Sequence, residues 1–191
     1  MPRKIELQVN KIKQSKNNCY FVHSEEVWIL NHKVLNQKKK HRKLEGNIFK
    51  ESLKMCIISP SSVLINKKLF KKYGMFNNRL RVCEDYELWI RLTSKVQVAL
   101  ISQPSVIKYG GHDDQLSKKF WGMDRFRVKA LEKLLLYIQL NLSQKKYMLS
   151  VLLTKINIIL IGAKNRKKIK MLRIYAYKKK YWLNVSRLIN G

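Results

Sequence analysis

The chain has 191 residues, of which 41 are Lys or Arg and only 12 are Asp or Glu, so its formal net charge is +29. Hydrophobic residues make up 46% of it, with 7 Gly and 3 Pro, which excludes wholesale disorder and collagen-like sequence. A chain of this length forms one domain, with or without a helical appendage, and needs no metal or disulfide to stabilise it. Cys19, Cys56 and Cys83 form no CxxC pair, which favours a reducing compartment over a zinc or disulfide framework.

The sequence predicts no membrane-spanning segment. The most apolar stretch, residues 148–163, is interrupted by Lys155 and is shorter than the ~20 residues that cross a bilayer. The first residues, MPRKIELQVNKIKQ, lack the apolar core of a secretory signal. We therefore expect a cytoplasmic location.

The first part of the chain mixes short extended and helical segments. Asn31-His32 predicts a hairpin turn because Asn tolerates positive φ, and Gly74 predicts a helix C-terminus. The expected elements are a helix end at 1–18, strands within 19–34, a charged loop at 38–43, a helical turn at 47–53, a buried strand at 55–65, helices at 66–73 and 84–94, and two strands at 96–101 and 105–109 broken by Pro104.

Everything from residue 118 onward predicts helix, because apolar residues recur every three to four positions. Asn141 or Ser143 caps a helix that runs to Gly162, and the linker KNRKK precedes a last basic helix. We therefore expect an α/β fold in two parts. Residues 1–117 form an incomplete mixed sheet with flanking helices, and residues 118–191 form a basic helical bundle.

The few acidic residues are clustered in a way that points to a site. Five of the 12 lie in two motifs, Glu84-Asp85-Tyr86-Glu87 and His112-Asp113-Asp114. The first motif falls at a predicted helix start, where carboxylates stabilise the helix dipole and cap free N–H groups. The functional alternative is a carboxylate that accepts a proton from a hydroxyl nucleophile.

The second motif, GGHDDQ at 110–115, follows a predicted strand and precedes a long helix. Paired glycines let the backbone approach a ligand, while His and Asp bind metal ions or diphosphate. The alternative is an ordinary turn with a helix cap.

Several blocks in a fixed order resemble the C-terminal half of bacterial family 2 glycosyltransferases. The likeness runs from about residue 19 to 140. It rests on CIISPSSVLI at 56–65, LF at 69–70 with YGMF at 73–76, CEDYELWIRL at 83–92, KYGGHDDQLS at 108–117 and FWGMDRFRVKALEKLL at 120–135.

The resemblance implies a GT-A fold and inverting transfer of a sugar from a nucleotide-sugar donor to an acceptor hydroxyl. By the match of the Glu-Asp motif, Asp85 is the general base and Glu84 supports it. His112 faces the donor diphosphate or its metal, with Gln115 and Ser117 nearby. Two tryptophans, Trp89 and Trp121, are interpreted as packing residues rather than sugar platforms.

The same resemblance implies a part that the sequence lacks. Such enzymes carry an N-terminal nucleotide-binding half that ends in an Asp-x-Asp motif, which holds a divalent metal, Mn or Mg, and the donor phosphates. The sequence contains no Asp-x-Asp. No metal ligand is assigned to this chain, and we expect no cofactor to bind it tightly.

Three hypotheses follow from this absence. The chain is a truncated glycosyltransferase that is inactive alone, one half of a split enzyme with a complementary N-terminal chain, or a non-catalytic basic protein that binds membrane or nucleic acid. The first is favoured. In the complete enzyme the partners are a nucleotide-sugar and a glycan or lipid-linked acceptor.

The charge distribution gives a further expectation about partners. After Glu132 the chain has 14 Lys or Arg and no acid, so residues 141–191 predict either peripheral contact with anionic lipid at the inner face of the membrane or a solvated helix face. Lysines outnumber arginines 31 to 10, and the sequence shows no RNP, zinc or KH signature. Nucleic acid is therefore not an expected partner.

Overall fold

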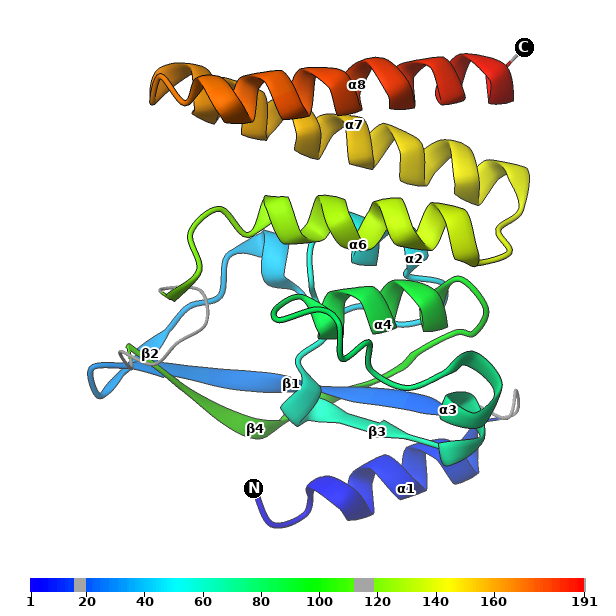
Figure 1. Ribbon diagram of the computed structural model, residues 1–191. Coiled ribbons are helices and arrows are strands. Elements are labelled where there is room, and N and C mark those ends of the chain that lie inside the picture. The colour runs from blue at the N-terminus through cyan, green and yellow to red at the C-terminus, as the bar shows by residue number, and fades with distance from the viewer. Residues whose placement is uncertain (16–19, 112–118, 191) are drawn as a thin grey trace.

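The computed structural model describes residues 1–15, 20–111 and 119–190, and within these ranges it has seven α-helices and a four-stranded mixed sheet (Figure 1). The helices are α1 (Lys4–Gln14), α2 (Phe49–Lys54), α3 (Lys67–Tyr73), α4 (Glu84–Thr93), α6 (Asp124–Tyr137), α7 (Leu142–Asn165) and α8 (Ile169–Asn190). The strands are β1 (Phe21–Leu30), β2 (Lys33–Leu35), β3 (Val63–Ile65) and β4 (Ala99–Gly110). The α/β class predicted from the sequence is confirmed.

Strand β1 is the centre of the sheet. One of its edges pairs in parallel with β4, from Val22 opposite Ala99 to Leu30 opposite Gly110. Its other edge pairs antiparallel with β3 near its start and with β2 near its end. The sheet is mixed because the β1–β2 hairpin reverses direction at once, whereas β4 returns through a long crossover.

The β1–β2 turn forms as the sequence predicts. Asn31 and His32 both adopt positive φ, 48° and 61°, which is the pair of values that a two-residue type I′ hairpin requires. The helix before Gly74 is also confirmed: Asn66 accepts a hydrogen bond from the Lys68 backbone N–H at 2.9 Å, and Gly74 has φ 84°.

Three predicted strands differ in the structure. Within 55–65 only β3 pairs as a strand, and a 3₁₀ turn that opens at Pro60 (Pro60–Ser62) directly precedes it. The two strands expected around Pro104 are one strand, β4, whose register with β1 shifts between Ile101 and Val106. Proline has no N–H for a ladder bond, and an irregularity in the pairing accommodates it without ending the strand.

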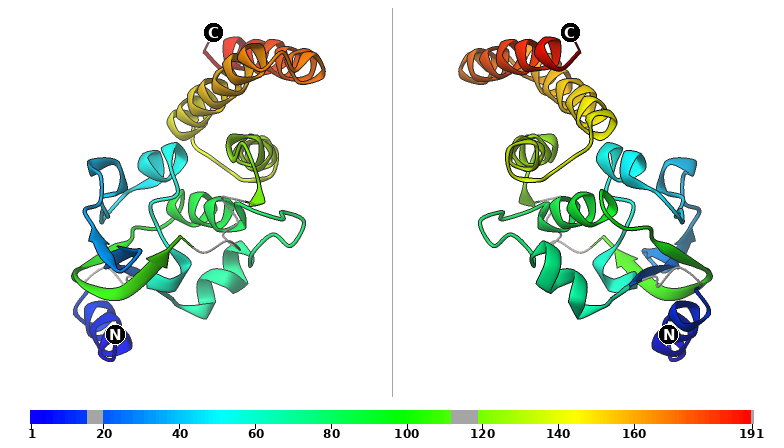
Figure 2. Two further views of the ribbon diagram at one scale, coloured as in Figure 1. Left: turned by 90° about the vertical axis from the view of Figure 1, so that its left-hand side faces the viewer. Right: turned by 90° about the vertical axis from the view of Figure 1, so that its right-hand side faces the viewer.

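The elements stack in layers on either side of the sheet (Figures 1 and 2). Helix α1 covers one face, and its buried Gln8 donates a hydrogen bond to the Ser62 carbonyl at 2.8 Å. Helix α4 covers the other face, and α6, α7 and α8 follow beyond it.

Two hydrophobic clusters meet at α4. Leu88, Trp89 and Leu92 pack toward the sheet with Phe21, while Tyr86 and Ile90 belong to a second cluster with the side chains of α6, α7 and α8. That second cluster joins residues on both sides of position 117.

Helix α7 is capped by Asn141. Its side chain accepts a hydrogen bond from the Gln144 N–H at 2.8 Å, while the Gln144 side chain accepts one from the Asn141 N–H at 3.1 Å. This capping box pairs backbone donors that the helix itself cannot pair. By length and composition α7 is the described helix that could cross a membrane, although 44% of its most apolar window is buried within the structure.

The sequence left either Asn141 or Ser143 as the cap of α7, and replacing each residue in turn tests that Asn141 is the cap. We expect Asn141→Ala to lower the free energy of unfolding by about 1 kcal/mol, because the capping box is lost. The matched variant Ser143→Ala should change it by less than about 0.5 kcal/mol, since Ser143 is exposed and its side chain is not one of the two that form the capping box. Urea denaturation followed by circular dichroism measures both, and equal losses would contradict the assignment.

Candidate active site

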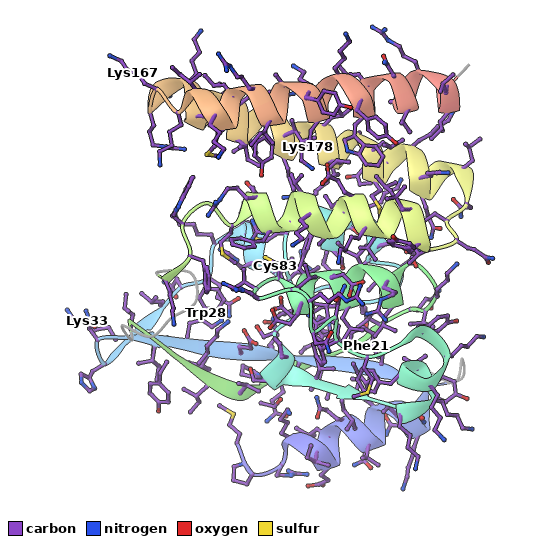
Figure 3. The ribbon with its side chains drawn as sticks, viewed as in Figure 1. Phe21, Trp28, Lys33, Cys83, Lys167 and Lys178 are labelled. Atoms are coloured by element: carbon purple, nitrogen blue, oxygen red, sulfur yellow. The ribbon has the colours of Figure 1, made fainter. Side chains whose placement is uncertain are left out.

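The Glu84-Asp85 pair lies at the first turn of α4, directly after a strained residue. Cys83 has φ 64° and ψ 21°, a left-handed conformation that costs energy in a residue with a side chain. This conformation turns the chain into the helix, so that Glu84 and Asp85 begin α4 beside α6 (Cys83 is labelled in Figure 3).

The two carboxylate oxygens of Asp85 accept hydrogen bonds of different strength. Its Oδ1 accepts a hydrogen bond from the Tyr86 N–H at 2.6 Å, and its Oδ2 accepts one from the Cys56 Sγ at 3.4 Å. A thiol is a poor donor, so the hydrogen bond to Oδ2 is weak. The buried Oε2 of Glu84 has no hydrogen-bond partner among the described residues.

The two thiols beside Asp85 are protonated groups rather than nucleophiles. Burial raises the pKa of Cys56 well above its ordinary value, and the nearby Asp85 carboxylate adds to the rise. Burial also raises the pKa of Cys83 to about 11. Because the thiolate is the reactive form of cysteine, neither side chain is suited to nucleophilic catalysis near neutral pH.

Helices α6 and α7 bring three charged residues to the same place, which the sequence analysis missed. Asp124 accepts hydrogen bonds from Arg127 at 3.0 Å and from Lys155 at 3.3 Å. Lys155 is buried and also donates to the Lys54 carbonyl at 3.1 Å. The lone Lys155 inside the apolar run of 148–163 was the available signal, since a buried ammonium needs a partner.

The charges of this cluster are held by one another. Burial lowers the pKa of Lys155, and the Asp124 carboxylate opposes that shift. Burial also acts to lower the pKa of Arg127, but its hydrogen bond to Asp124 and the charge of Asp124 outweigh burial, so the net shift is upward. Asp124 is thus the counter-ion of both Arg127 and Lys155.

The start of α4 faces the side of the molecule where β1 and β4 end (Figure 1). In open α/β sheets, ligands bind at the carboxyl ends of the parallel strands. The other predicted site residues, His112, Gln115 and Ser117, follow β4 in sequence but lie outside the described residues. The structure therefore places Glu84 and Asp85 at the start of α4 and does not place the other three predicted residues.

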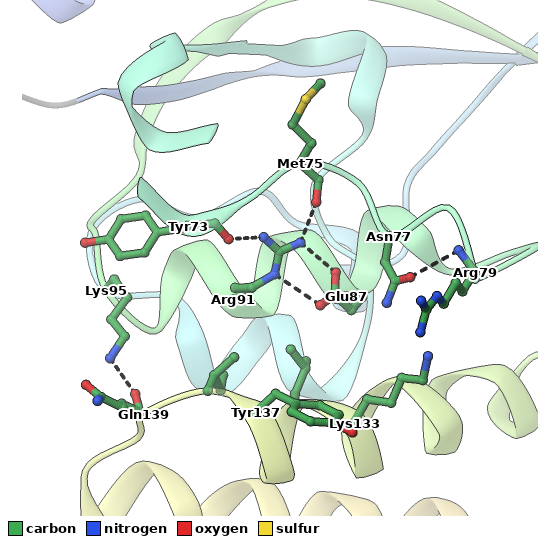
Figure 4. A pocket seen from close by; sticks show the side chains of 12 residues that line it. Tyr73, Met75, Asn77, Arg79, Glu87, Arg91, Lys95, Lys133, Tyr137 and Gln139 are labelled. Atoms are coloured by element: carbon green, nitrogen blue, oxygen red, sulfur yellow. Dashed lines mark hydrogen bonds and ion pairs between the residues drawn. The ribbon is translucent and has the colours of Figure 1, made fainter. Parts of the chain in front are cut away.

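A cavity of about 740 Å³ lies on another side of α4, between the loop after α3 and helix α6 (Figure 4). Arg91 lies at its wall and donates hydrogen bonds to Glu87 and to the carbonyls of Tyr73, Gly74 and Met75. Glu87, the third acid of the first motif, therefore has a structural partner. Neither Glu84 nor Asp85 lines this cavity.

A second buried charge pair joins β1 to residues 38–43, the segment predicted to be a charged loop. Lys43 Nζ lies 3.5 Å from Glu26 Oε2, and both side chains are almost fully buried. Burial alone raises the pKa of Glu26, but the Lys43 ammonium and hydrogen bonds from Ser59 and Trp28 bring it below its ordinary value. Lys43 was missed because five other residues of the run 38–43 (KKKHRK) are also basic.

The two tryptophans interpreted as packing residues differ. Trp89 is buried, with its ring centroid 5.4 Å from Phe21, so its packing role is confirmed. Trp121 is 46% exposed and lies between Arg125, 3.8 Å from the ring centroid, and Lys168, 4.4 Å from it. Trp121 makes cation–π contacts at the surface, and its interpretation as a packing residue stays a prediction.

No protein-family model matches the chain, and no curated protein or solved structure is significantly similar to it. Within residues 1–15, 20–111 and 119–190, no three His, Cys, Asp or Glu side chains are grouped so that they could hold a metal ion. No catalytic step is assigned through a metal ion.

Removing the shared carboxylate should destabilise the fold. We expect Asp124→Asn to lower the free energy of unfolding by about 2–3 kcal/mol, because Arg127 and Lys155 lose their counter-ion. Adding Lys155→Met should recover part of this loss, since an apolar side chain of similar length needs no partner. Urea denaturation of the single and double variants measures it; an unchanged midpoint in Asp124→Asn would contradict the cluster's role.

Buried His23 should make stability depend on pH. Burial lowers the pKa of His23 from 6.5 to about 4, and the charge of Lys43 adds to this shift. The hydrogen bond to the Leu44 carbonyl and the charges of Glu26 and Glu45 oppose it. Between these values the unfolded chain binds a proton that the folded chain does not, so stability is lost as pH falls from about 6.5 to 4. The loss attributable to His23 is about 3 kcal/mol.

The matched variant is His23→Gln, which removes the titrating group. Its unfolding free energy should fall less than that of the unmodified chain between pH 7 and pH 4, measured by urea denaturation at several pH values. Parallel pH profiles for the two proteins would show that His23 does not titrate on unfolding.

Proposed function

We propose that this chain is the acceptor-side part of an inverting, GT-A-type family 2 glycosyltransferase, in which Asp85 accepts the proton of the acceptor hydroxyl. The observation that carries the proposal is the position of Glu84-Asp85 at the start of a buried helix, on the side where the parallel strands β1 and β4 end. The ordered sequence blocks that resemble this family support it independently.

The chemistry needs one base at this position. In a direct displacement, the acceptor oxygen attacks the anomeric carbon from the side opposite the nucleotide. The bond from that carbon to the diphosphate oxygen breaks, and its electron pair leaves with the diphosphate. The hydroxyl proton passes to Asp85 Oδ2, whose present donor is the weak Cys56 thiol.

The helix that carries Asp85 is packed firmly into its surroundings. Tyr86 beside it is buried, and its hydroxyl donates a hydrogen bond to the Leu53 carbonyl at 2.5 Å. A base on an element held in this way keeps its geometry without reorganising during the reaction. The left-handed Cys83 is consistent with the same interpretation, since strained backbone is concentrated at functional sites.

Binding of the nucleotide-sugar donor is assigned to a part of the enzyme outside this chain's 191 residues. The group that stabilises a departing diphosphate must be electrophilic, a metal ion or a set of cations, and the sequence contains no Asp-x-Asp motif. We propose that a nucleotide-binding part, in a longer form of this chain or in a second polypeptide, completes the site.

The test measures release of nucleoside diphosphate from a panel of nucleotide-sugars. We expect none from the chain alone. Together with the protein segment encoded upstream of Met1, we expect turnover that Asp85→Asn lowers at least about 100-fold, because the base is removed.

The control is Glu6→Gln, which removes one negative charge from exposed helix α1 on the other face of the sheet. It should leave turnover unchanged. Turnover by the chain alone would contradict the need for a second part, and full activity of a folded Asp85→Asn variant would contradict the assignment of the base.

A further inference from the structure

Helix α8 presents a regular amphipathic face to solvent. Ile174, Tyr181 and Leu188 recur every seven residues and, with Tyr177, form a stripe in which the exposed fractions of 174, 177, 181 and 188 are 45%, 74%, 49% and 83%. Residues seven apart lie on the same side of a helix. We call these four residues the apolar stripe.

A row of basic side chains runs beside the apolar stripe with the same period. Arg173, Lys180 and Arg187 each precede a stripe residue and are exposed. None of the three has an ion pair within the part of the chain that the structure describes. We call these three residues the basic row.

The inner face of α8 is anchored, which fixes the apolar stripe outward. Lys178 donates to Glu132 at 2.7 and 2.5 Å, and the buried Trp182 donates to the same carboxylate at 2.9 Å. Lys178 lies on the side of α8 that faces the other helices, and α8 is the outermost layer of the stack (Figures 1 and 3).

The charge of this region restricts what can cover the stripe. Glu132 is the last acid of the chain and is already paired. A second copy docked through α8 would bring another basic row against the first, because no acid on α8 can alternate with it. The partner must therefore be apolar and negatively charged on the same surface.

We propose that this face of α8 binds the surface of an anionic lipid bilayer, with the helix lying in the plane of the membrane. The apolar stripe enters the boundary between headgroups and acyl chains, where tyrosine is favoured, and the basic row lies against the lipid phosphates. Nucleic acid would use the basic row but gives no favourable contact to Ile174 or Leu188. This inference does not rest on the proposed enzymatic function.

The experiment is flotation of the full chain with lipid vesicles, which separates bound protein from aggregates because aggregates sink. The vesicles are phosphatidylcholine alone, or phosphatidylcholine with about one-third phosphatidylglycerol, in about 0.1 M salt, where the Debye length is about 10 Å. We expect binding to the anionic vesicles and none to phosphatidylcholine alone.

Two variants separate the contribution of the basic row from that of the apolar stripe. Reversing the basic row, Arg173→Glu with Lys180→Glu and Arg187→Glu, should weaken binding about 100-fold or more. The charge-neutral pair Tyr177→Asn with Leu188→Asn should weaken it about 10-fold. The matched control reverses Lys67, Lys68 and Lys71 to Glu on exposed positions of α3, and it should change binding less than about 3-fold.

Each remaining outcome counts against the proposal. Equal loss in the α3 control would show attraction by net charge alone, and unchanged binding in Tyr177→Asn with Leu188→Asn would show that the stripe does not enter the bilayer. Tighter binding to a short DNA duplex than to the vesicles would favour nucleic acid. A dimer in sedimentation velocity that dissociates on Leu188→Asn would favour a second copy.

Discussion

The burial of α4 between the sheet and the C-terminal helices is the constraint on which the rest of the structure depends. Leu88, Trp89 and Leu92 fill the cluster against the sheet, while Tyr86 and Ile90 fill the cluster against the C-terminal helices. Protein interiors are close-packed, so α4 cannot shift without opening one of the two clusters. The first turn of the helix is therefore held in a defined place.

Three of the few carboxylates connect residues that are distant in the sequence. Glu26 joins β1 to the segment before α2, Asp124 joins α6 to α7, and Glu132 joins α6 to α8. A buried ammonium without a partner is expensive. In a chain with 41 basic residues, the positions of the acids therefore decide which lysines can enter the interior.

Local signals in the sequence predicted local structure well. The Asn31-His32 turn, the Asn66 cap with Gly74, and the helix at 84–93 follow from residues within a few positions of one another. The errors arise where distant residues decide. Pro104 remains inside a strand because β1 supports both sides of the irregularity.

The candidate site could be predicted only in part for the same reason. Glu84-Asp85 stands out as an acidic motif in a basic chain, and its position at a helix start follows from the sequence. Its partner Cys56 and the ion pair of Asp124 with Lys155 come from three other segments. No local pattern indicates that these segments meet, because tertiary packing brings them together.

The parallel pairing of β1 with β4 also has a consequence for the order of assembly. Val22 pairs with Ala99, 77 positions along the chain (99 minus 22), whereas α6, α7 and α8 contact their neighbours in sequence. Contacts between distant positions require the closure of a long loop and form slowly. One edge of β1 therefore stays unpaired until the whole crossover containing α2, α3 and α4 has been made. During synthesis from the N-terminus, that edge stays open until β4 itself has emerged.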